Sequence, residues 1–218
     1  MNFKSLVSFV FCISLVANLQ AQILPATFGV YNPPFLFSEV TSAGGRIWMD
    51  RNLGATRVAA SSTDSDSYGN LYQWGRGVDG HQLRTTSNAN FTKASSEPYD
   101  WRNPQNDNLW QGVSGTNNPC PSGFRLPTET EWAAERLSWG SNNAAGALAS
   151  PLKLPMAGYR DVMNGSLTNV GSVGNYWSST AIDAFYKYSR FLNFNSSLQE
   201  MVTGYRGYGF SVRCIKNQ

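Results

Sequence analysis

Two cysteines constrain the possible fold of this chain more than any other feature of its sequence. Residues 1–22 place Lys4 before an apolar run and end in small and polar residues, which is the layout of a secretory signal peptide. We expect residues 1–21 to be removed, and Cys12 with them. Cys120 and Cys214 then enter an oxidising compartment alone, so we predict a disulfide between them. The alternative, two free thiols for redox or metal chemistry, would require both to be close together and activated.

Composition limits the class of protein. The 218 residues are 41% hydrophobic, 13% aromatic and only 14% charged, which excludes a disordered chain. A formal net charge of +3 gives no strong field to attract nucleic acid. No segment after the leader is apolar enough to suggest a membrane helix. We therefore expect an extracytoplasmic protein, whether secreted, periplasmic or held on the outer cell surface.

The pattern of the remaining chain predicts one α+β domain over residues 40–218, after an extended lead-in at residues 22–39 that contains Pro33-Pro34. Thr128 and Glu131 form a capping box, so we expect a helix of about ten residues over 128–138. Residues 79–118 are rich in polar and turn-forming residues and are expected to be long ordered loops. Short apolar runs separated by Gly and Asn turns predict an antiparallel sheet. These runs lie at residues 46–50, 72–74, 153–159, 176–179, 189–194 and 210–215.

Six ordered blocks resemble a known bacterial family. The sequence NPCPSGFRLPT from Asn118, followed by Glu131-Trp132, resembles the family named the Fibrobacter succinogenes major paralogous domain. Each block is weak alone, but their shared order makes a chance match improbable over about residues 40–216. The other five blocks are WMDRNLG from Trp48, YGNLYQWG from Tyr68, MAGYR from Met156, YWSST from Tyr176 and GFSVRC from Gly209.

The resemblance extends to the formylglycine-generating-enzyme superfamily, through Arg-Leu-Pro-Thr-x-x-Glu-Trp from Arg125 and the closing Gly-Phe-x-x-Arg-Cys. It implies a C-type-lectin-like fold, with short antiparallel strands and long ordered loops. The catalytic cysteine pair of those enzymes is missing, because Gly209 stands five positions before Cys214. The related sulfoxide synthases bind iron through three histidines, and this chain has only His81. We therefore expect no catalytic residue, metal or cofactor, and we expect His81 to be a solvated loop residue.

Calcium stays open as an alternative, although the calcium-dependent sugar motifs of C-type lectins are not present. Calcium takes six to eight oxygen ligands. Several loop aspartates could contribute some of them, and we assign none as a ligand. These residues are Asp64, Asp66, Asp79, Asp100 and Asp107.

Residues 175–210 interleave aromatic and polar side chains and are the best candidate for a ligand surface. Alternation along a strand predicts that Leu192 and Phe194 face the core while Phe191, Asn193 and Asn195 face outward. The segment also looks like the variable region of lectin-fold proteins diversified by retroelements. Tyr and Asn suit recognition, since Tyr offers a large area at low entropic cost. The predicted ligand-binding residues are Phe191, Asn193, Asn195, Tyr205, Arg206 and Tyr208.

The leading hypothesis is thus a secreted or cell-surface binding module without catalytic activity. Its expected partner is a glycan or another exported protein, and we expect neither nucleic acid nor an integral membrane segment. Two alternatives remain: an enzyme on the formylglycine-generating type of scaffold that uses a free cysteine, and a retroelement-diversified ligand-binding protein.

Overall fold

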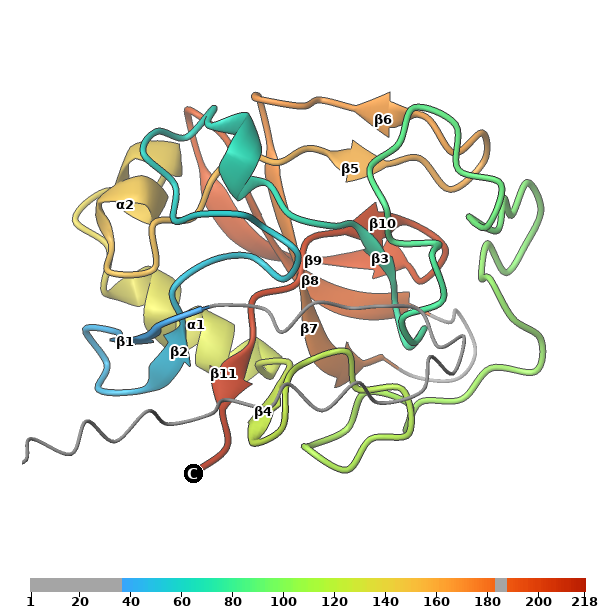
Figure 1. Cartoon of the computed structure of the whole chain (residues 1–218), viewed down its shortest axis with the longest axis horizontal. Coiled ribbons are helices and arrows are strands. Elements are labelled where there is room, and N and C mark those ends of the chain that lie inside the picture. Colours follow the sequence, from blue (N-terminus) through green and yellow to red (C-terminus); the bar gives the residue numbers. More distant parts are fainter. Residues whose placement is uncertain (1–36, 183–187) are drawn as a thin grey trace, which may run out of the picture. The chain divides into compact units, whose positions relative to one another are not determined.

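The strands form three antiparallel sheets in the computed structural model, which describes residues 37–182 and 188–218 (Figure 1). Their orders are β1-β2-β11-β4, β3-β10-β5-β6 and β7-β8-β9. Two α-helices and one short 3-10 helix, η1, accompany them in the described residues. The elements are β1 (Glu39–Thr41), β2 (Ile47–Met49), η1 (Ser65–Ser67), β3 (Tyr72–Gln73), β4 (Phe124–Arg125), α1 (Glu129–Leu137), α2 (Ala144–Ala149), β5 (Tyr159–Arg160), β6 (Leu167–Thr168), β7 (Gly174–Ala181), β8 (Tyr188–Phe194), β9 (Gln199–Tyr205), β10 (Gly209–Phe210) and β11 (Ile215–Lys216).

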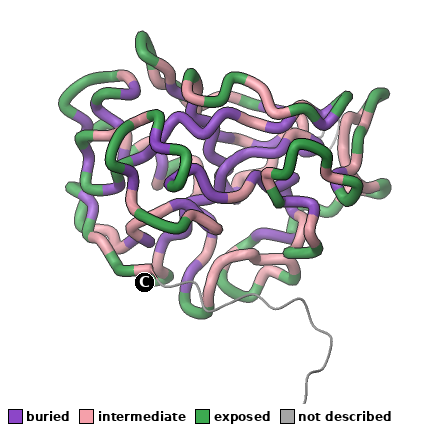
Figure 2. Tube along the Cα trace, turned by 45° about the horizontal axis from the view of Figure 1, so that its top comes forward, coloured by how far each residue is buried: buried purple, intermediate pink, exposed green. Residues whose placement is uncertain are grey.

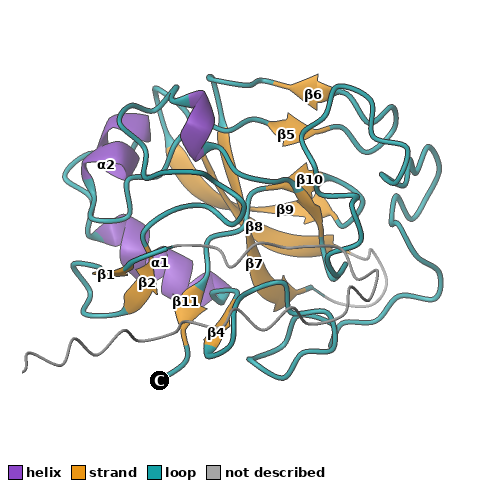
Figure 3. Ribbon diagram, viewed as in Figure 1, coloured by secondary structure: helices purple, strands orange, loops and turns teal. Residues whose placement is uncertain are grey.

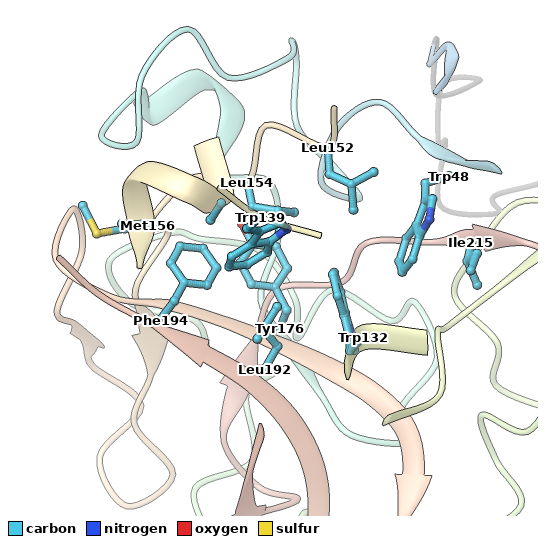
Figure 4. Close-up of a cluster of buried hydrophobic side chains, with 12 residues drawn as sticks. Trp48, Trp132, Trp139, Leu152, Leu154, Met156, Tyr176, Leu192, Phe194 and Ile215 are labelled. Carbon is cyan, nitrogen blue, oxygen red and sulfur yellow. The ribbon is translucent and has the colours of Figure 1, made fainter. Parts of the chain in front are cut away.

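The three-stranded sheet β7-β8-β9 is covered on both faces. On one face, Leu192 and Phe194 of β8 pack with Trp132 of α1 in a first hydrophobic cluster (Figure 4). On the other face, Phe191 of β8 packs with Trp177 in a second cluster, which also contains side chains of β3 and β10. Alternate residues of one strand therefore enter two different cores. Figure 2 shows the result, with buried backbone running through the middle of the described chain.

Helix α1 begins where the capping box predicts. The Thr128 hydroxyl accepts the Glu131 N–H at 3.2 Å, and the Glu131 carboxylate accepts the Thr128 N–H at 2.8 Å. Two otherwise orphaned donors of the first turn are thereby satisfied. Helix α2 was not expected from the sequence. Its cap is Asn143, whose side chain accepts the N–H groups of Ala145 and Gly146.

The long loops are confirmed. Residues 74–123, all described, contain no helix or strand (Figure 3). Trp110 is fully buried and donates its indole N–H to the Asn117 carbonyl at 2.9 Å. Trp101 donates to the Trp74 carbonyl at 2.6 Å. Hydrogen-bonded indoles thus hold these irregular segments in place, since a tryptophan side chain supplies apolar area and one N–H donor together.

The expected strands are confirmed in part. Strands β2, β3, β7 and β8 lie within or around four of the predicted runs, whereas the run 153–159 is wrong except at Tyr159. Leu154 and Met156 of that run are buried, but they belong to irregular chain outside any strand. The predicted run 210–215 is divided between β10 and β11. Strand β9, at residues 199–205, was missed because Gln199, Glu200 and Thr203 interrupt its apolar pattern.

The predicted disulfide is confirmed: Cys120 and Cys214 are bonded, with their Cα atoms 5.9 Å apart. The signal-peptide prediction, residues 1–21, lies outside the described residues, as does most of the lead-in, and β1 begins at Glu39. Within the part of the chain that the structure describes, no helix has the length and apolarity needed to cross a membrane. The mostly antiparallel sheets with few helices confirm the α+β class.

Candidate functional site

Partly exposed tyrosines gather at one place on the molecule. The described residues contain eight tyrosines, of which Tyr68, Tyr72 and Tyr176 are buried. The other five are half-buried and form a connected group that we call the tyrosine surface. Its members are Tyr99, Tyr159, Tyr188, Tyr205 and Tyr208.

Ring contacts connect the tyrosine surface. Tyr205 is central: its ring centre lies 4.6 Å from that of Tyr99, 4.9 Å from Tyr188 and 6.4 Å from Tyr208. Tyr208 in turn lies 5.8 Å from Tyr159. These separations are those of interacting aromatic pairs. The rings therefore support one another, and little rotamer freedom remains to be lost when a ligand binds.

The sheet register accounts for part of this arrangement. Tyr188 at the start of β8 and Tyr205 at the end of β9 are directly opposed partners in the antiparallel pair. Tyr208 stands in the turn between β9 and β10, and Tyr159 belongs to β5, which pairs with β10. The Tyr208 ring stacks on the buried Phe210 at 5.5 Å. The surface is thus fixed directly to the second core.

Tyr99 arrives from the long loops through a close backbone contact. The Gly207 N–H donates to the Tyr99 carbonyl at 3.0 Å. A Cβ atom at position 207 would lie 2.5 Å from that carbonyl oxygen, so only glycine permits the approach. Tyr99 itself has a φ of 52°, in the left-handed region that tyrosine rarely adopts. Surrounding structure must hold this conformation, and such positions cluster at functional sites.

The electrostatic environment of the tyrosine surface is acidic. The Tyr205 hydroxyl donates to Glu97 Oε1 at 3.3 Å. Hydrogen bonding with Tyr188 and the nearby Glu97 charge raise the pKa of Tyr205. Burial, with a contribution from the charge of Asp161, raises the pKa of Tyr159 and of Tyr208. The hydroxyls of Tyr159, Tyr205 and Tyr208 are therefore protonated at neutral pH and can act as hydrogen-bond donors or acceptors.

The structure separates the six predicted ligand-binding residues into three groups. Tyr205 and Tyr208 lie in the tyrosine surface. Asn193 and Asn195 lie at the other end of β8, beside the turn that leads to β9. Asn193 donates from Nδ2 to Asn175 Oδ1 at 2.6 Å, and Asn195 accepts the backbone N–H groups of the turn. Asn193 thus links β8 to β7, and Asn195 holds the turn between β8 and β9.

The outward orientation predicted for Phe191 is wrong. Phe191 is 9% exposed and its ring lies 4.5 Å from that of Phe210 and 5.7 Å from that of Trp177. Alternation along the strand is correct, but the face opposite Leu192 is also covered. A strand pattern alone does not reveal whether its second face meets solvent or another sheet.

Arg206 is likewise not at the surface. Its side chain is 1% exposed, lies over the Trp74 ring at 4.3 Å and pairs with Asp107 at 2.6 Å. Arg206 also donates to the Tyr188 carbonyl at 3.3 Å, so it supports the tyrosine surface from below. Tyr99, Tyr159 and Tyr188 were not predicted as contacts. A correct hairpin register would have placed Tyr188 opposite Tyr205, whereas nothing in the sequence brings Tyr99 there.

His81 is not a solvated loop residue: it is 0% exposed. Its Nε2 accepts the Gln73 N–H at 3.1 Å, and its Nδ1 lies 2.7 Å from Asp79 Oδ1. The neutral ring with its proton on Nδ1 satisfies both contacts. Burial, reinforced by the Arg76 charge, lowers the pKa of His81 to about 4. Both ring nitrogens are thus used, Nδ1 by Asp79 of the loop and Nε2 by Gln73 of β3.

Among the described residues, no group of three or more His, Cys, Asp or Glu side chains could hold a metal ion. The loop aspartates considered for calcium therefore form no such group in the described residues. Comparison of the chain with protein-family models, curated proteins and solved structures gave no match. The tyrosine surface is therefore the candidate site on its own geometry.

Proposed function

We propose that this protein is an extracytoplasmic, non-catalytic binding module that recognises a glycan or an exported protein through the tyrosine surface. The observation that carries the proposal is the gathering of all five half-buried tyrosines of the described residues in one connected group. Tyrosine is enriched where proteins recognise ligands because it combines large apolar area with a polar tip. Aromatic groups of this kind also stack against sugar rings.

Charge narrows the ligand class. The two acidic side chains that influence the tyrosines are Glu97 and Asp161. Polyanionic ligands would be repelled by such neighbours at short range. We accordingly favour a neutral or basic ligand over a sulfated glycan or a nucleic acid.

We further propose that the chain has a C-type-lectin-like fold and belongs with the major paralogous domain proteins. The blocks that carry this resemblance contribute mainly to the cores. Arg213 of the last block is 1% exposed and donates to Asn52 Oδ1, in the first block, at 2.9 Å. Trp48, Trp74 and Trp177, each from a different block, are fully buried. Shared motifs would then specify the scaffold, and the tyrosine surface, mostly outside them, would specify the ligand.

The disulfide favours the binding module over an enzyme that uses a free cysteine. Cys214 is 0% exposed and bonded to Cys120, and a disulfide sulfur is not a nucleophilic thiolate. A titration that finds free thiols in the unfolded, unreduced protein would return the enzyme hypothesis to first place.

Binding of the purified, oxidised protein to a glycan array, with calcium and with a chelator, tests the proposal first. A pull-down against exported proteins of the source organism follows for protein ligands. For the ligand found, Tyr205→Ala and Tyr208→Ala should each weaken binding by about tenfold or more, equivalent to about 1.4 kcal/mol. Leu137→Ala, at a side chain that is 75% exposed on α1, is the control and should bind normally. Unchanged binding by both tyrosine variants would refute the assignment.

A further inference from the structure

One indole in this protein lacks a hydrogen-bond acceptor. All seven tryptophans lie in the described residues, and six donate their Nε1–H to a carbonyl or carboxylate oxygen. Trp48 is the exception: it is 1% exposed, and its Nε1 has no partner among the described residues. Buried donors are almost always paired, and an unpaired one carries an unfavourable free energy.

Trp48 lines a cavity of about 200 Å³ between α1 and the turn that joins β1 to β2. Figure 4 shows the Trp48 indole at the edge of the first cluster, near Trp132. Two more unpartnered buried atoms belong to side chains that line the same cavity, Nε of Arg46 and Oε2 of Glu135. Two N–H donors and one carboxylate oxygen, all from side chains that line this cavity, therefore lack hydrogen-bond partners.

One carboxylate oxygen of Glu135 has a hydrogen-bond donor, and the other, Oε2, has none. Glu135 is 3% exposed, and its Oε1 accepts the Trp139 indole N–H at 3.3 Å. Burial raises the pKa of Glu135, although Trp139, Ser42 and the Arg213 charge act in the opposite direction. The terminal nitrogen of Arg46 is bonded to Glu131 at 2.8 Å, which leaves its Nε free. At 34% exposure the Arg46 side chain is the accessible wall of the cavity.

The donors and the acceptor without partners indicate the chemical class of ligand that would fit this cavity. A hydroxyl accepts from an indole N–H and donates to a carboxylate at the same time. Arg46 and Arg125 both pair with Glu131, and Glu135 supplies a second acidic side chain, so the cavity lies among groups of both signs and does not call for a strongly charged guest. Its volume equals that of roughly six or seven water molecules, which suits a single small ring and not a polymer. We propose that this cavity binds a neutral polyhydroxyl molecule the size of one monosaccharide, held by Trp48, Glu135 and Arg46.

The Trp48 indole provides a direct test, because its N–H proton gives one of seven signals in a ¹H–¹⁵N spectrum of the oxidised protein. Trp48→Phe assigns the signal by deleting it. We expect D-glucose, D-galactose or D-mannose at millimolar concentration to shift the Trp48 signal in a saturable way. The Trp132 ring lies 4.9 Å from that of Trp48 and Trp139 is bonded to Glu135, so the reference signals that should stay in place are those of Trp74, Trp101, Trp110 and Trp177. Tetrahydropyran, the same ring without hydroxyls, should cause no shift.

Two variants separate binding from folding. Glu135→Gln keeps the acceptor for Trp139 but replaces Oε2 with a donor, and should raise the Kd at least tenfold. Ala134→Leu places a larger side chain at an exposed lining position and should abolish the shift while the other indole signals remain. Ala145→Leu, an exposed alanine of α2, is the matched control and should bind normally.

Absence of a saturable shift with all three sugars would mean that the cavity holds only water, and would overturn the proposal. A shift with glycine or alanine but not with sugars would overturn the ligand class. The test is independent of the tyrosine surface, because Tyr205→Ala should leave the Trp48 shift unchanged.

Discussion

The guanidinium carbon of Arg206 lies 4.3 Å from the centre of the Trp74 ring, and both side chains are 1% exposed. Arg206 also forms an ion pair with Asp107, with 2.6 Å between nitrogen and oxygen. A cation that is stacked on a buried ring and paired with a carboxylate is an anchor between β9 and the long loops. Substitutions at Arg206 should therefore reduce stability, and they should remove no direct ligand contact.

Arg206→Ala should lower the free energy of unfolding by about 2–4 kcal/mol, since it removes the stacking and the ion pair and leaves a space. Chemical denaturation at neutral pH measures the difference. Arg102→Ala is the matched control: Arg102 stacks on Trp101 at 5.7 Å but is partly exposed, so its loss should amount to less than about 1 kcal/mol. A smaller effect for Arg206 than for Arg102 would contradict the anchoring role.

Asn193→Ala should destabilise the pairing of β7 with β8 without weakening ligand binding. The variant deprives Asn175 Oδ1 of its 2.6 Å hydrogen bond, and Asn175 is only 5% exposed. An unmet buried acceptor costs about 1–3 kcal/mol. Denaturation and ligand titration on the same preparation separate the two effects. Weaker binding at unchanged stability would place Asn193 in the ligand site after all.

Acid should destabilise the protein partly through His81. The unfolded side chain takes up a proton near pH 6.5, whereas the folded one does so only at about pH 4. Between these values the unfolded state holds more protons, so the free energy of unfolding falls as pH decreases from about 6.5 to 4. The full contribution is roughly 3 kcal/mol.

A single histidine makes this test direct, because its C2–H proton signal reports one titration. The midpoint should lie near pH 4 in the folded protein, and a midpoint near 6.5 would show that the ring is solvated. His81→Gln can still accept the Gln73 N–H through its side-chain oxygen. This variant should lose the part of the pH dependence between pH 6.5 and 5, where few carboxylates titrate.

Removal of the disulfide by the double substitution Cys120→Ala and Cys214→Ala should lower the free energy of unfolding by about 2–5 kcal/mol. The bridge connects residues separated by 94 positions, and the lost constraint acts mainly on the unfolded chain. Reduction of the unsubstituted protein with a thiol should give a similar destabilisation. A change below about 1 kcal/mol in both experiments would show that packing alone closes the loop.

Local signals in the sequence predicted the fold best. The capping box at Thr128 located α1, because both of its hydrogen bonds lie within four residues. Cys120 and Cys214 were paired by simple elimination. The sequence does not predict helix α2, because a six-residue helix has too few turns for a periodic pattern. It does not predict strand β9, because polar residues interrupt the apolar alternation of that strand. Pairing with β8 stabilises β9, whereas α2 is alanine-rich and capped by Asn143, so local preference does support it.

The candidate site was predicted less completely for a related reason. Alternation correctly divided Phe191 from Leu192. Phe191 is nevertheless covered by Phe210 of β10, which belongs to a different sheet together with β3, β5 and β6. His81 was misjudged in the same way, because its burial depends on Gln73 and on the loops around it. Tyr205 and Tyr208 were found, whereas Tyr99 joins them only through the contact between its carbonyl and Gly207. Such long-range approaches leave no trace in a local pattern.

The two shortest C-terminal strands have a consequence for how the protein is made. Strand β10 lies between β3 and β5, and β11 lies between β2 and β4, so residues 209–216 occupy interior positions in two sheets. Their partners cannot complete either sheet while these residues are still inside the ribosome. Synthesis from the N-terminus therefore leaves both sheets incomplete until residues 209–216 have emerged, so closure of these sheets must follow the synthesis of β2, β3, β4 and β5.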